Sequence, residues 1–347
     1  MTGKAVDVRS KILAWKAQLR APFLTASGLP IILGTSVALA LHGIVLWDVF
    51  FLAIVAGLCL HLGANSTNDY FDHTEEGSGS DDINVNLVRP FTGGSRMLQK
   101  GVLLPKEVLA GSLLFFMVGS LIGLYLVYSR GLFILVLGLI GAGSGFFYSA
   151  PPFRFVNRGI GELVIGLNFG VLTTFGGYYV QTLDFNPEPI FASIPLATLI
   201  AGILFINEFP DYNADKGAGK RTLVVRLGRK KASRFYAILM VFLYTYTLIA
   251  GFLQLISITS LITFSTLPIA VFATRHTLQN YESPQDISPA NASAVVLHLL
   301  FGIGLSIAYV LDYFRLGFLW IMLFSVVFLL SSSIFVWCIS KSNHNTG

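Results

Sequence analysis

Long apolar stretches alternate with short polar segments along the whole of this 347-residue chain. A transmembrane helix needs about 20 mainly apolar residues, and ten stretches are close to that length. Helices are expected near 23–43, 48–67, 107–128, 131–150, 160–180, 189–207, 234–254, 257–274, 292–311 and 317–339. Within 234–274, two helices would have to share a very short turn. The pattern therefore predicts an all-α polytopic membrane bundle of nine to ten transmembrane helices.

The composition supports this fold class. Hydrophobic residues make up 54% of the chain and charged residues 12%, and the mean hydropathy is +0.72. A soluble domain carries about 25% charged residues, so the composition excludes a soluble α/β enzyme, a disordered chain and a disulfide scaffold. Cys59 and Cys338 lie in apolar stretches and form no metal-binding or redox pattern.

The basic residues predict how the bundle is oriented. If the N-terminus defines one side, that side carries 21 of the 23 Lys and Arg residues, and Arg130 and Arg315 are left for the other. Cytoplasmic loops carry the excess of Lys and Arg, so the N-terminus is expected in the cytoplasm and the chain in the plasma membrane. The net charge of +5 comes from short loops without a continuous basic face. No nucleic-acid partner and no obligate protein partner are therefore expected.

The first 20 residues place basic side chains among apolar ones, which predicts an amphipathic helix at the membrane surface over 1–20. Ala38-Leu39-Ala40 resembles a signal-peptide cleavage site. Further apolar stretches follow directly, however, and this favours an uncleaved first helix.

Acidic residues form a pattern that occurs twice. Nine of the 18 carboxylates follow the second and sixth apolar stretches, where NDYFDHTEE (68–76) and NEFPDYNAD (207–215) share the pattern N-[DE]-x-x-D-x-x-x-[DE] at an offset of 139 residues. In a helix, the Asn, the middle Asp and the last acid lie along one face. Two such helix ends facing each other would bring four carboxylates and two amide oxygens together.

This arrangement predicts a cation site. Carboxylates at this density repel one another unless a cation lies among them, and hard oxygen ligands suit Mg²⁺. Zinc is not expected, because no cluster of His and Cys lies nearby. The segments RPFTGGSR (89–96) and KGAGKRT (216–222) place basic side chains and glycines beside the two acidic motifs. Such segments bind phosphate groups, so a metal-bound diphosphate explains both features together.

With these motifs, the chain resembles the UbiA-type intramembrane prenyltransferase superfamily. Its hallmarks are N-D-x-x-D-x-x-x-D after the second helix, matched here except that Glu76 replaces the last Asp, and D-x-x-x-D after the sixth, matched fully by DYNAD (211–215). The resemblance covers residues 15–310 and also rests on LRAPFLTASGLPIILGT (19–35), YSAPPFRFVNRGIGEL (148–163), FGVLTTFGGYYVQT (169–182) and DKGAGKRTLVVRLG (215–228). GELVIGLNFG and GGYYVQT look most like the menaquinone-pathway branch, which prenylates 1,4-dihydroxy-2-naphthoate.

The resemblance implies Mg²⁺-dependent transfer of a polyprenyl group from its diphosphate to an aromatic acceptor. The implied metal-binding set is Asn68, Asp69, Asp72, Glu76, Asn207, Asp211 and Asp215, with Asp69 and Glu76 as secondary members. The implied diphosphate-binding set is Arg89, Arg96, Lys220 and Arg221. Tyr148 and Arg154 would close over the diphosphate or the acceptor. The resemblance therefore implies a catalytic set made of these two residues and three of the acids: Asp72, Asp211, Asp215, Tyr148 and Arg154.

The expected layout is a single transmembrane domain over 1–347 with two pseudo-repeated halves and a cytoplasmic cap. Residues 68–105 and 208–232 are expected to form the active-site loops of this cap. The family usually has nine spans, so 317–339 is expected to be an added C-terminal helix. Two alternatives stay open. One is another acceptor, such as 4-hydroxybenzoate, homogentisate, a tetrapyrrole or a lipid. The other is a cation transporter, which the position of the acids at helix ends disfavours.

Overall fold

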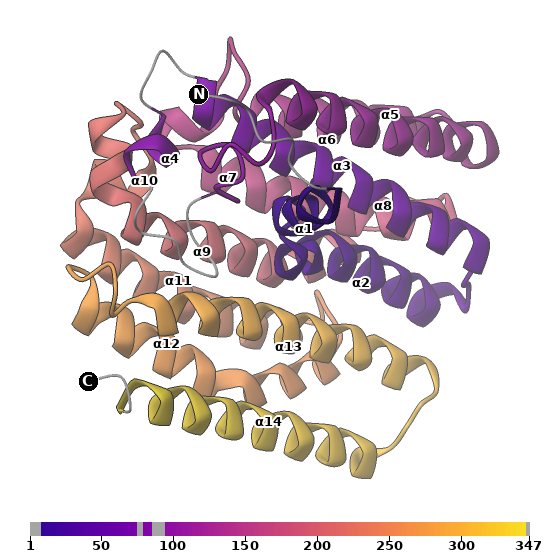
Figure 1. The fold of residues 1–347 in the computed structure, drawn as a ribbon. Coiled ribbons are helices and arrows are strands. Elements are labelled where there is room, and N and C mark those ends of the chain that lie inside the picture. The colour runs from indigo at the N-terminus through magenta and orange to yellow at the C-terminus, as the bar shows by residue number, and fades with distance from the viewer. Residues whose placement is uncertain (1–7, 75–78, 85–93, 345–347) are drawn as a thin grey trace.

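The computed structural model describes residues 8–74, 79–84 and 94–344, and within these ranges the chain is helical and contains no strand (Figure 1). In chain order the elements are α1 (Val8–Gln18), η1 (Ala21–Leu24), α2 (Thr25–His42), α3 (Trp47–Thr74), α4 (Ser80–Ile83), α5 (Pro105–Arg130), α6 (Phe133–Phe147), η2 (Phe155–Arg158), α7 (Gly161–Ile165), η3 (Gly166–Leu172), α8 (Thr173–Thr182), α9 (Glu188–Gly217), α10 (Leu223–Leu227), α11 (Arg229–Phe252), η4 (Ile258–Thr266), α12 (Leu267–Asn280), α13 (Ser288–Tyr313) and α14 (Phe318–His344). The all-α prediction is confirmed.

Nine helical stretches in the described residues are long and apolar enough to cross a membrane. The remaining predicted span, 131–150, is the shorter helix α6 of 15 residues. At 1.5 Å per residue α6 extends about 22 Å, less than the roughly 30 Å of a hydrocarbon core. The short turn expected within 234–274 is present, because residues 253–257 separate α11 from η4.

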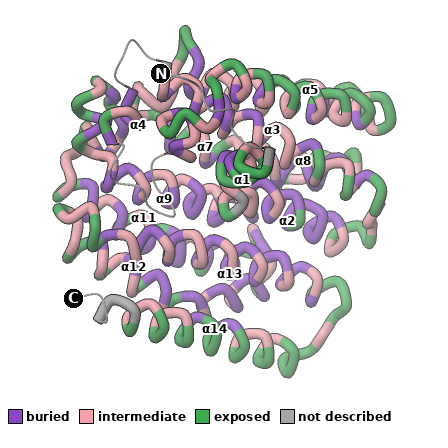
Figure 2. Tube along the Cα trace, viewed as in Figure 1, coloured by how far each residue is buried: buried purple, intermediate pink, exposed green. Residues whose placement is uncertain are grey.

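The helices lie side by side, with α2, α9 and α13 at the centre and α5 and α14 at opposite edges (Figures 1 and 2). In the most apolar stretches of α9 and α13, 67% of the residues are buried, compared with 17% in α5 and 11% in α14. Helices that are apolar on all sides but exposed require an apolar solvent. The chain is therefore an integral membrane protein.

Glycines allow the central helices to approach closely. A Cβ atom at Gly34 of α2 would lie 2.1 Å from the carbonyl oxygen of Thr174 in α8, and a Cβ at Gly170 of η3 would lie 2.4 Å from Cα of Ala197 in α9. Small residues at helix crossings give membrane bundles their contact area. The crossing at Gly34 holds α2 against α8, and the crossing at Gly170 holds η3, a π-helical segment, against α9.

Helices α3 and α9 extend beyond the apolar stretches and contain 28 and 30 residues. Both acidic motifs therefore begin on the last turns of helices rather than in loops, and 208–217, expected as a loop, is helical. The short elements α4, α7 and α10 lie around the same end of the bundle (Figure 1). Whether this end is a cytoplasmic cap stays a prediction.

The N-terminal helix α1 packs across the bundle instead of lying free. Ala14 is buried among Leu98, Leu103 and Val108, while Ile12 and Leu13 are exposed. Lys11 Nζ donates a hydrogen bond to Glu107 Oε1 at 2.5 Å and so ties α1 to the start of α5. A position at the membrane surface stays a prediction.

Candidate active site

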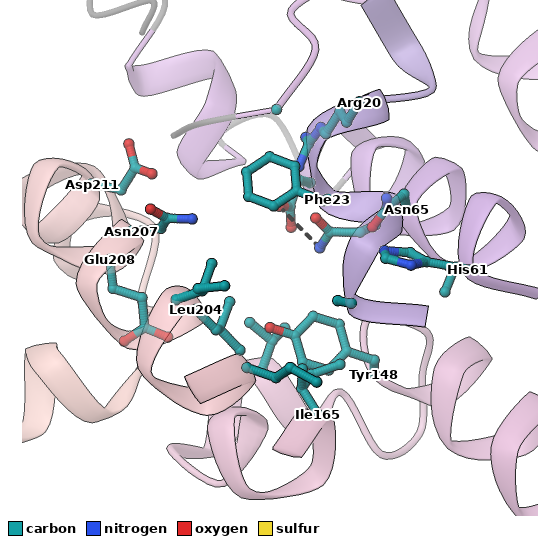
Figure 3. A pocket seen from close by; sticks show the side chains of 18 of the residues that line it. Arg20, Phe23, His61, Asn65, Tyr148, Ile165, Leu204, Asn207, Glu208 and Asp211 are labelled. Carbon is teal, nitrogen blue, oxygen red and sulfur yellow. Dashed lines mark hydrogen bonds between the residues drawn. The ribbon is translucent and has the colours of Figure 1, made fainter. Parts of the chain in front are cut away.

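The two acidic motifs face each other across one cavity. Asn68 and Asp72 line it from α3, and Asn207, Asp211 and Asp215 line it from α9. Within each motif these residues are four apart, so the helical period places them on the same face. The two helix ends therefore bring these five residues to one cavity, and Figure 3 labels Asn207 and Asp211 among them.

The cavity has a volume of about 210 Å³ and joins polar and apolar surfaces. Its polar part carries the motif side chains together with Ser80, Asp81 and Lys220. Its apolar part consists of Phe23, Ile165, Phe169, Ile200, Ile203, Leu204 and Val295, among others. A ligand with an anionic head and an apolar body fits such a division.

Lys220 reaches the cavity because the chain turns back at the end of α9. Gly219 has a left-handed φ of 73°, and the backbone N–H of Lys220 donates to the carbonyl oxygen of Asp215 at 2.8 Å. A glycine with this conformation is the usual way to end a helix. The Lys220 ammonium then donates a hydrogen bond to Asp72 Oδ1 at 2.6 Å and links the two motifs.

Charge compensation explains the state of this lysine. Burial alone would lower the pKa of Lys220, but the carboxylates of Asp72 and Asp215 outweigh burial and raise that pKa above its ordinary value. Lys220 therefore stays protonated and supplies a fixed positive charge between the two helix ends.

The two asparagines are oriented by hydrogen bonds. Asn68 Nδ2 donates to Ser149 Oγ at 2.8 Å and to Asp72 Oδ2 at 3.3 Å. Because its amide N–H groups bind protein oxygens, its own oxygen is available to a cation. Asn207 Oδ1 accepts a hydrogen bond from Asn291 Nδ2 at 2.8 Å.

Asp69 is placed differently from the other acids of its motif. Its carboxylate accepts hydrogen bonds from Gln18 Nε2 at 2.9 Å and from the Ser95 backbone N–H at 3.0 Å, and it forms an ion pair with Arg20. It is not among the residues that line the cavity. Through these contacts Asp69 holds α1 and the 94–96 segment against α3.

The remaining predicted site residues are only partly brought together. Tyr148 lines the cavity, whereas Arg96, Arg154 and Arg221 do not. Arg96 Nη1 forms an ion pair with Asp81 Oδ1 at 2.8 Å, and Arg221 is exposed. Glu76 and Arg89 lie outside the described residues.

Tyr148 contributes a buried aromatic ring at the edge of the cavity (Figure 3). Burial, followed by the negative charges of Glu208 and Glu162, raises the pKa of Tyr148 well above its ordinary value. The phenol therefore keeps its proton, and its ring supplies a neutral π surface.

Cavity residues that were not assigned a site role from the sequence include Arg20, His61, Asn65, Asp81 and Glu208. For His61 and Asn65 a signal exists, because with Asn68 and Asp72 they fall at i, i+4, i+7 and i+11, one face of α3. Asp81 belongs to the same acidic stretch as Asp72 but lies outside the repeated spacing. Burial raises the pKa of its carboxyl group, and the Arg96 guanidinium opposes that rise.

A comparison with protein families decides which class this cavity belongs to. A model described as the UbiA prenyltransferase family matches residues 27–290. The chain belongs to the UbiA prenyltransferase family. The resemblance stated from the motifs, and the enzyme class it implied, are thereby confirmed.

Individual relatives cover most of this prenyltransferase. It is 30% identical over 297 residues to 2-carboxy-1,4-naphthoquinone phytyltransferase of Synechocystis sp., which covers 85% of this chain and 92% of that protein. It is 28% identical over 293 residues to 1,4-dihydroxy-2-naphthoate octaprenyltransferase of Bacillus subtilis, which covers 84% and 90%. A solved UbiA homolog from Archaeoglobus fulgidus, bound to DMAPP and Mg²⁺, has a TM-score of 0.54 and 16% identity over 84% of this chain and 98% of that one. At that identity the likeness supports the fold.

The donor atoms of this prenyltransferase are of the kind that Mg²⁺ prefers. No three His, Cys, Asp or Glu side chains within 8–74, 79–84 and 94–344 are grouped closely enough to hold a metal ion by themselves. Mg²⁺ does not require such a group, because it commonly takes one or two carboxylates and completes its shell with water and substrate phosphates. Carboxylate and amide oxygens from both helix ends line the same cavity, so the residues present would fit Mg²⁺ bound together with a diphosphate.

Proposed function

We propose that this prenyltransferase transfers a polyprenyl group from polyprenyl diphosphate to 1,4-dihydroxy-2-naphthoate, with Mg²⁺ as cofactor. The observation that carries the proposal is the cavity that Asp72, Asp211 and Lys220 line together and that continues into an apolar wall. Such a cavity matches a substrate with a diphosphate head and an isoprenoid body. The acceptor is taken from the name of the Bacillus subtilis relative, a 1,4-dihydroxy-2-naphthoate octaprenyltransferase; the Synechocystis relative is named for the related 2-carboxy-1,4-naphthoquinone.

In this proposal the helix ends bind the diphosphate. Asn68, Asp72, Asn207, Asp211 and Asp215 would hold Mg²⁺, directly or through water. When bound, Mg²⁺ would offset the negative charge that develops on the leaving diphosphate. Asp69 would be a support for α3, while the role of Glu76 stays a prediction.

Lys220 is the basic residue with the strongest support for diphosphate binding. Its ammonium lines the cavity beside Asp72, and it has three N–H donors, of which Asp72 takes one. The others would donate to diphosphate oxygens. Arg96 would act through Asp81, and contributions from Arg89, Arg154 and Arg221 stay predictions.

The apolar wall would receive the first isoprene units. Ile200, Ile203 and Leu204 of α9, with Val295 of α13, line this side of the cavity. When the allylic C–O bond breaks, its electron pair leaves with the diphosphate and the carbon becomes electron-poor. A wall without polar groups keeps water from capturing that carbon, and the neutral ring of Tyr148 offers it a π face.

The membrane orientation is part of the same proposal. With 21 of 23 Lys and Arg on the side of the N-terminus, the helix ends that carry the two motifs would face the cytoplasm of the plasma membrane. The diphosphate would then enter from the cytoplasm while the isoprenoid body stays in the bilayer.

The test is turnover by the purified full-length protein with a labelled polyprenyl diphosphate. 1,4-Dihydroxy-2-naphthoate and 4-hydroxybenzoate are offered in parallel, with Mg²⁺ and with EDTA. Prenylated naphthoate that forms only with Mg²⁺ is the expected result. Product with 4-hydroxybenzoate alone would overturn the acceptor, and undiminished turnover in EDTA would overturn the cofactor.

A further inference from the structure

His61 is a buried polar residue of the cavity that prenyl transfer, as proposed above, leaves without a role. It lies on α3, on the face that carries Asn65 and Asn68, and it is 6% exposed. Seven residues separate it from Asn68, which is about 10 Å along the helix axis. His61 is therefore set back from the diphosphate end of the cavity by a distance that the reacting carbon and an aromatic ring can fill.

The His61 ring is held in a defined orientation. Ser27 Oγ of α2 lies 2.6 Å from His61 Nδ1, and the Phe169 ring of η3 lies 4.6 Å from the imidazole, centroid to centroid. Two contacts from two different elements leave the ring little rotational freedom. Figure 3 shows the imidazole pointing toward the cavity.

The second ring nitrogen of His61 is available to a ligand. Within the described parts of the chain, Nδ1 is hydrogen-bonded to Ser27 Oγ and Nε2 has no hydrogen-bond partner. One turn along α3, Asn65 Nδ2 is buried and also has no hydrogen-bond partner among the described residues. Two neighbouring polar groups without partners in an otherwise apolar region are costly unless a ligand binds them.

A comparison within the chain separates this site from ordinary core packing. His298 of α13 is also fully buried, and neither of its ring nitrogens has a partner among the described residues. His298 does not line the cavity, so it shows what a histidine enclosed in the core looks like here. His61 differs because its Nδ1 is hydrogen-bonded to Ser27 and its ring lines the cavity.

We propose that His61 is the acceptor-binding residue: Nε2 accepts a hydrogen bond from a ring hydroxyl of the aromatic acceptor. In this tautomer Nδ1–H donates to Ser27 Oγ, and the acceptor ring packs beside Phe169 and Phe23. Asn65 Nδ2 donates to a second oxygen of the same acceptor. A hydroxyl that donates to imidazole leaves more electron density on its ring, which favours attack on the prenyl carbon.

This inference rests on the proposed function and deepens it, because it selects hydroxylated aromatic acceptors. The proposed ligand lies deeper than the diphosphate, on the α3 and η3 side of the cavity, opposite the aliphatic residues of α9. The two substrates would thus bind to different walls and meet near Asn68.

The two amide substitutions of His61 give a sharp test. The glutamine amide reaches the place of imidazole Nε2, whereas the shorter asparagine amide reaches only the place of Nδ1. His61→Gln should therefore keep the bond to the acceptor, and His61→Asn should keep only the bond to Ser27. His298→Asn is the matched control, since it shortens a buried histidine away from the cavity.

The measured quantities are the KM for each substrate and the melting temperature. We expect His61→Asn to raise the acceptor KM about tenfold, which corresponds to about 1.4 kcal/mol and one lost hydrogen bond. The KM for polyprenyl diphosphate should stay within about twofold of the parent value, and His61→Gln should restore most of the acceptor affinity. His298→Asn should leave the acceptor KM unchanged even if it lowers the melting temperature.

Competitive inhibition by 1-hydroxy-2-naphthoate and 4-hydroxy-2-naphthoate tests the contact directly. In the parent protein, the analogue that lacks the bound hydroxyl should bind about tenfold more weakly than the other. In His61→Asn that difference should disappear. A difference that persists unchanged would overturn the proposal.

Failure of this inference is distinguishable from failure of the proposed function. If the parent protein prenylates 4-hydroxybenzoate and not naphthoate, the acceptor assignment fails, and the same KM comparison is made with that hydroxylated acid. If His61→Asn and His61→Gln both keep the parent acceptor KM, or if both raise the two KM values equally, His61 does not bind the acceptor.

Discussion

Replacement of Lys220 by methionine tests whether the Lys220 ammonium stabilises the protein by neutralising the buried carboxylates at the two helix ends. The substitution keeps an unbranched side chain but removes the ammonium that donates to Asp72 Oδ1 at 2.6 Å. The side chains of Lys220 and Asp72 are 4% and 12% exposed. Removing one member of a buried ion pair leaves an uncompensated charge and costs about 3–5 kcal/mol.

This cost translates into a measurable shift. At about 2 °C per kcal/mol, the lower end of the range for large domains, the melting temperature should fall by about 6–10 °C in EDTA. If Mg²⁺ binds the folded protein as proposed, it supplies the missing positive charge beside Asp72 and Asp215. Its addition should therefore raise the melting temperature of Lys220→Met more than that of the parent protein.

The assay is thermal unfolding of the detergent-purified protein, with and without Mg²⁺. Lys216→Met is the control, because Lys216 is an exposed lysine of the same segment. Its effect should stay within about 0.5 kcal/mol. Equal melting temperatures of the two variants in EDTA would refute the neutralising role of Lys220. An equal response of both variants to Mg²⁺ would refute the idea that the ion and Lys220 share the same carboxylates.

Three further predictions concern the reaction and the packing. Asp72→Ala and Asp211→Ala should each abolish turnover while the purified variants still insert into membranes; activity retained in both would contradict the metal assignment. Tyr148→Phe should keep kcat/KM within about threefold, because the ring and not the hydroxyl provides the contact, whereas Tyr148→Ala should lower it more than about tenfold; equal losses would assign the role to the hydroxyl. Gly34→Ala should lower the free energy of unfolding by about 1–3 kcal/mol or more, because its Cβ would meet backbone atoms of α8. Gly123 has open space around it, so Gly123→Ala should raise the free energy of unfolding by up to about 1 kcal/mol. The melting temperatures of the two variants test both expectations.

The membrane fold could be predicted from the sequence because its signals are local. The length and apolarity of each stretch determine whether it can span a bilayer, whatever its neighbours are. The predicted helix 131–150 was longer than the observed helix α6, because Gly131 and the turn after Phe147 limit it to 15 residues. The spacing in NDYFDHTEE and NEFPDYNAD likewise determined which side chains share a helix face, since the helical period is fixed by the backbone.

The division of roles among the acids was decided by tertiary structure. Asp69 and Asp72 are three residues apart in one motif, yet Asp69 is enclosed by Gln18, Arg20 and Ser95, and Asp72 faces the cavity. The partners of Asp69 come from α1, from the turn that follows it, and from a segment more than 20 residues further along the chain. No local sequence pattern predicts which side of α3 those segments cover.

The same reason explains the residues that sequence analysis left without a role. His61 lies seven residues before its motif and becomes part of the cavity only because η1, η3 and α9 leave that side of α3 open. Lys220 was expected to bind the diphosphate, but its pairing with Asp72, 148 residues earlier in the chain, was not predicted, because it depends on the packing of two distant segments. Sequence by itself determined the helices, their hydrophobic lengths and the faces that carry oxygen ligands. Which faces meet depends on packing between distant segments, and only the tertiary structure records its outcome.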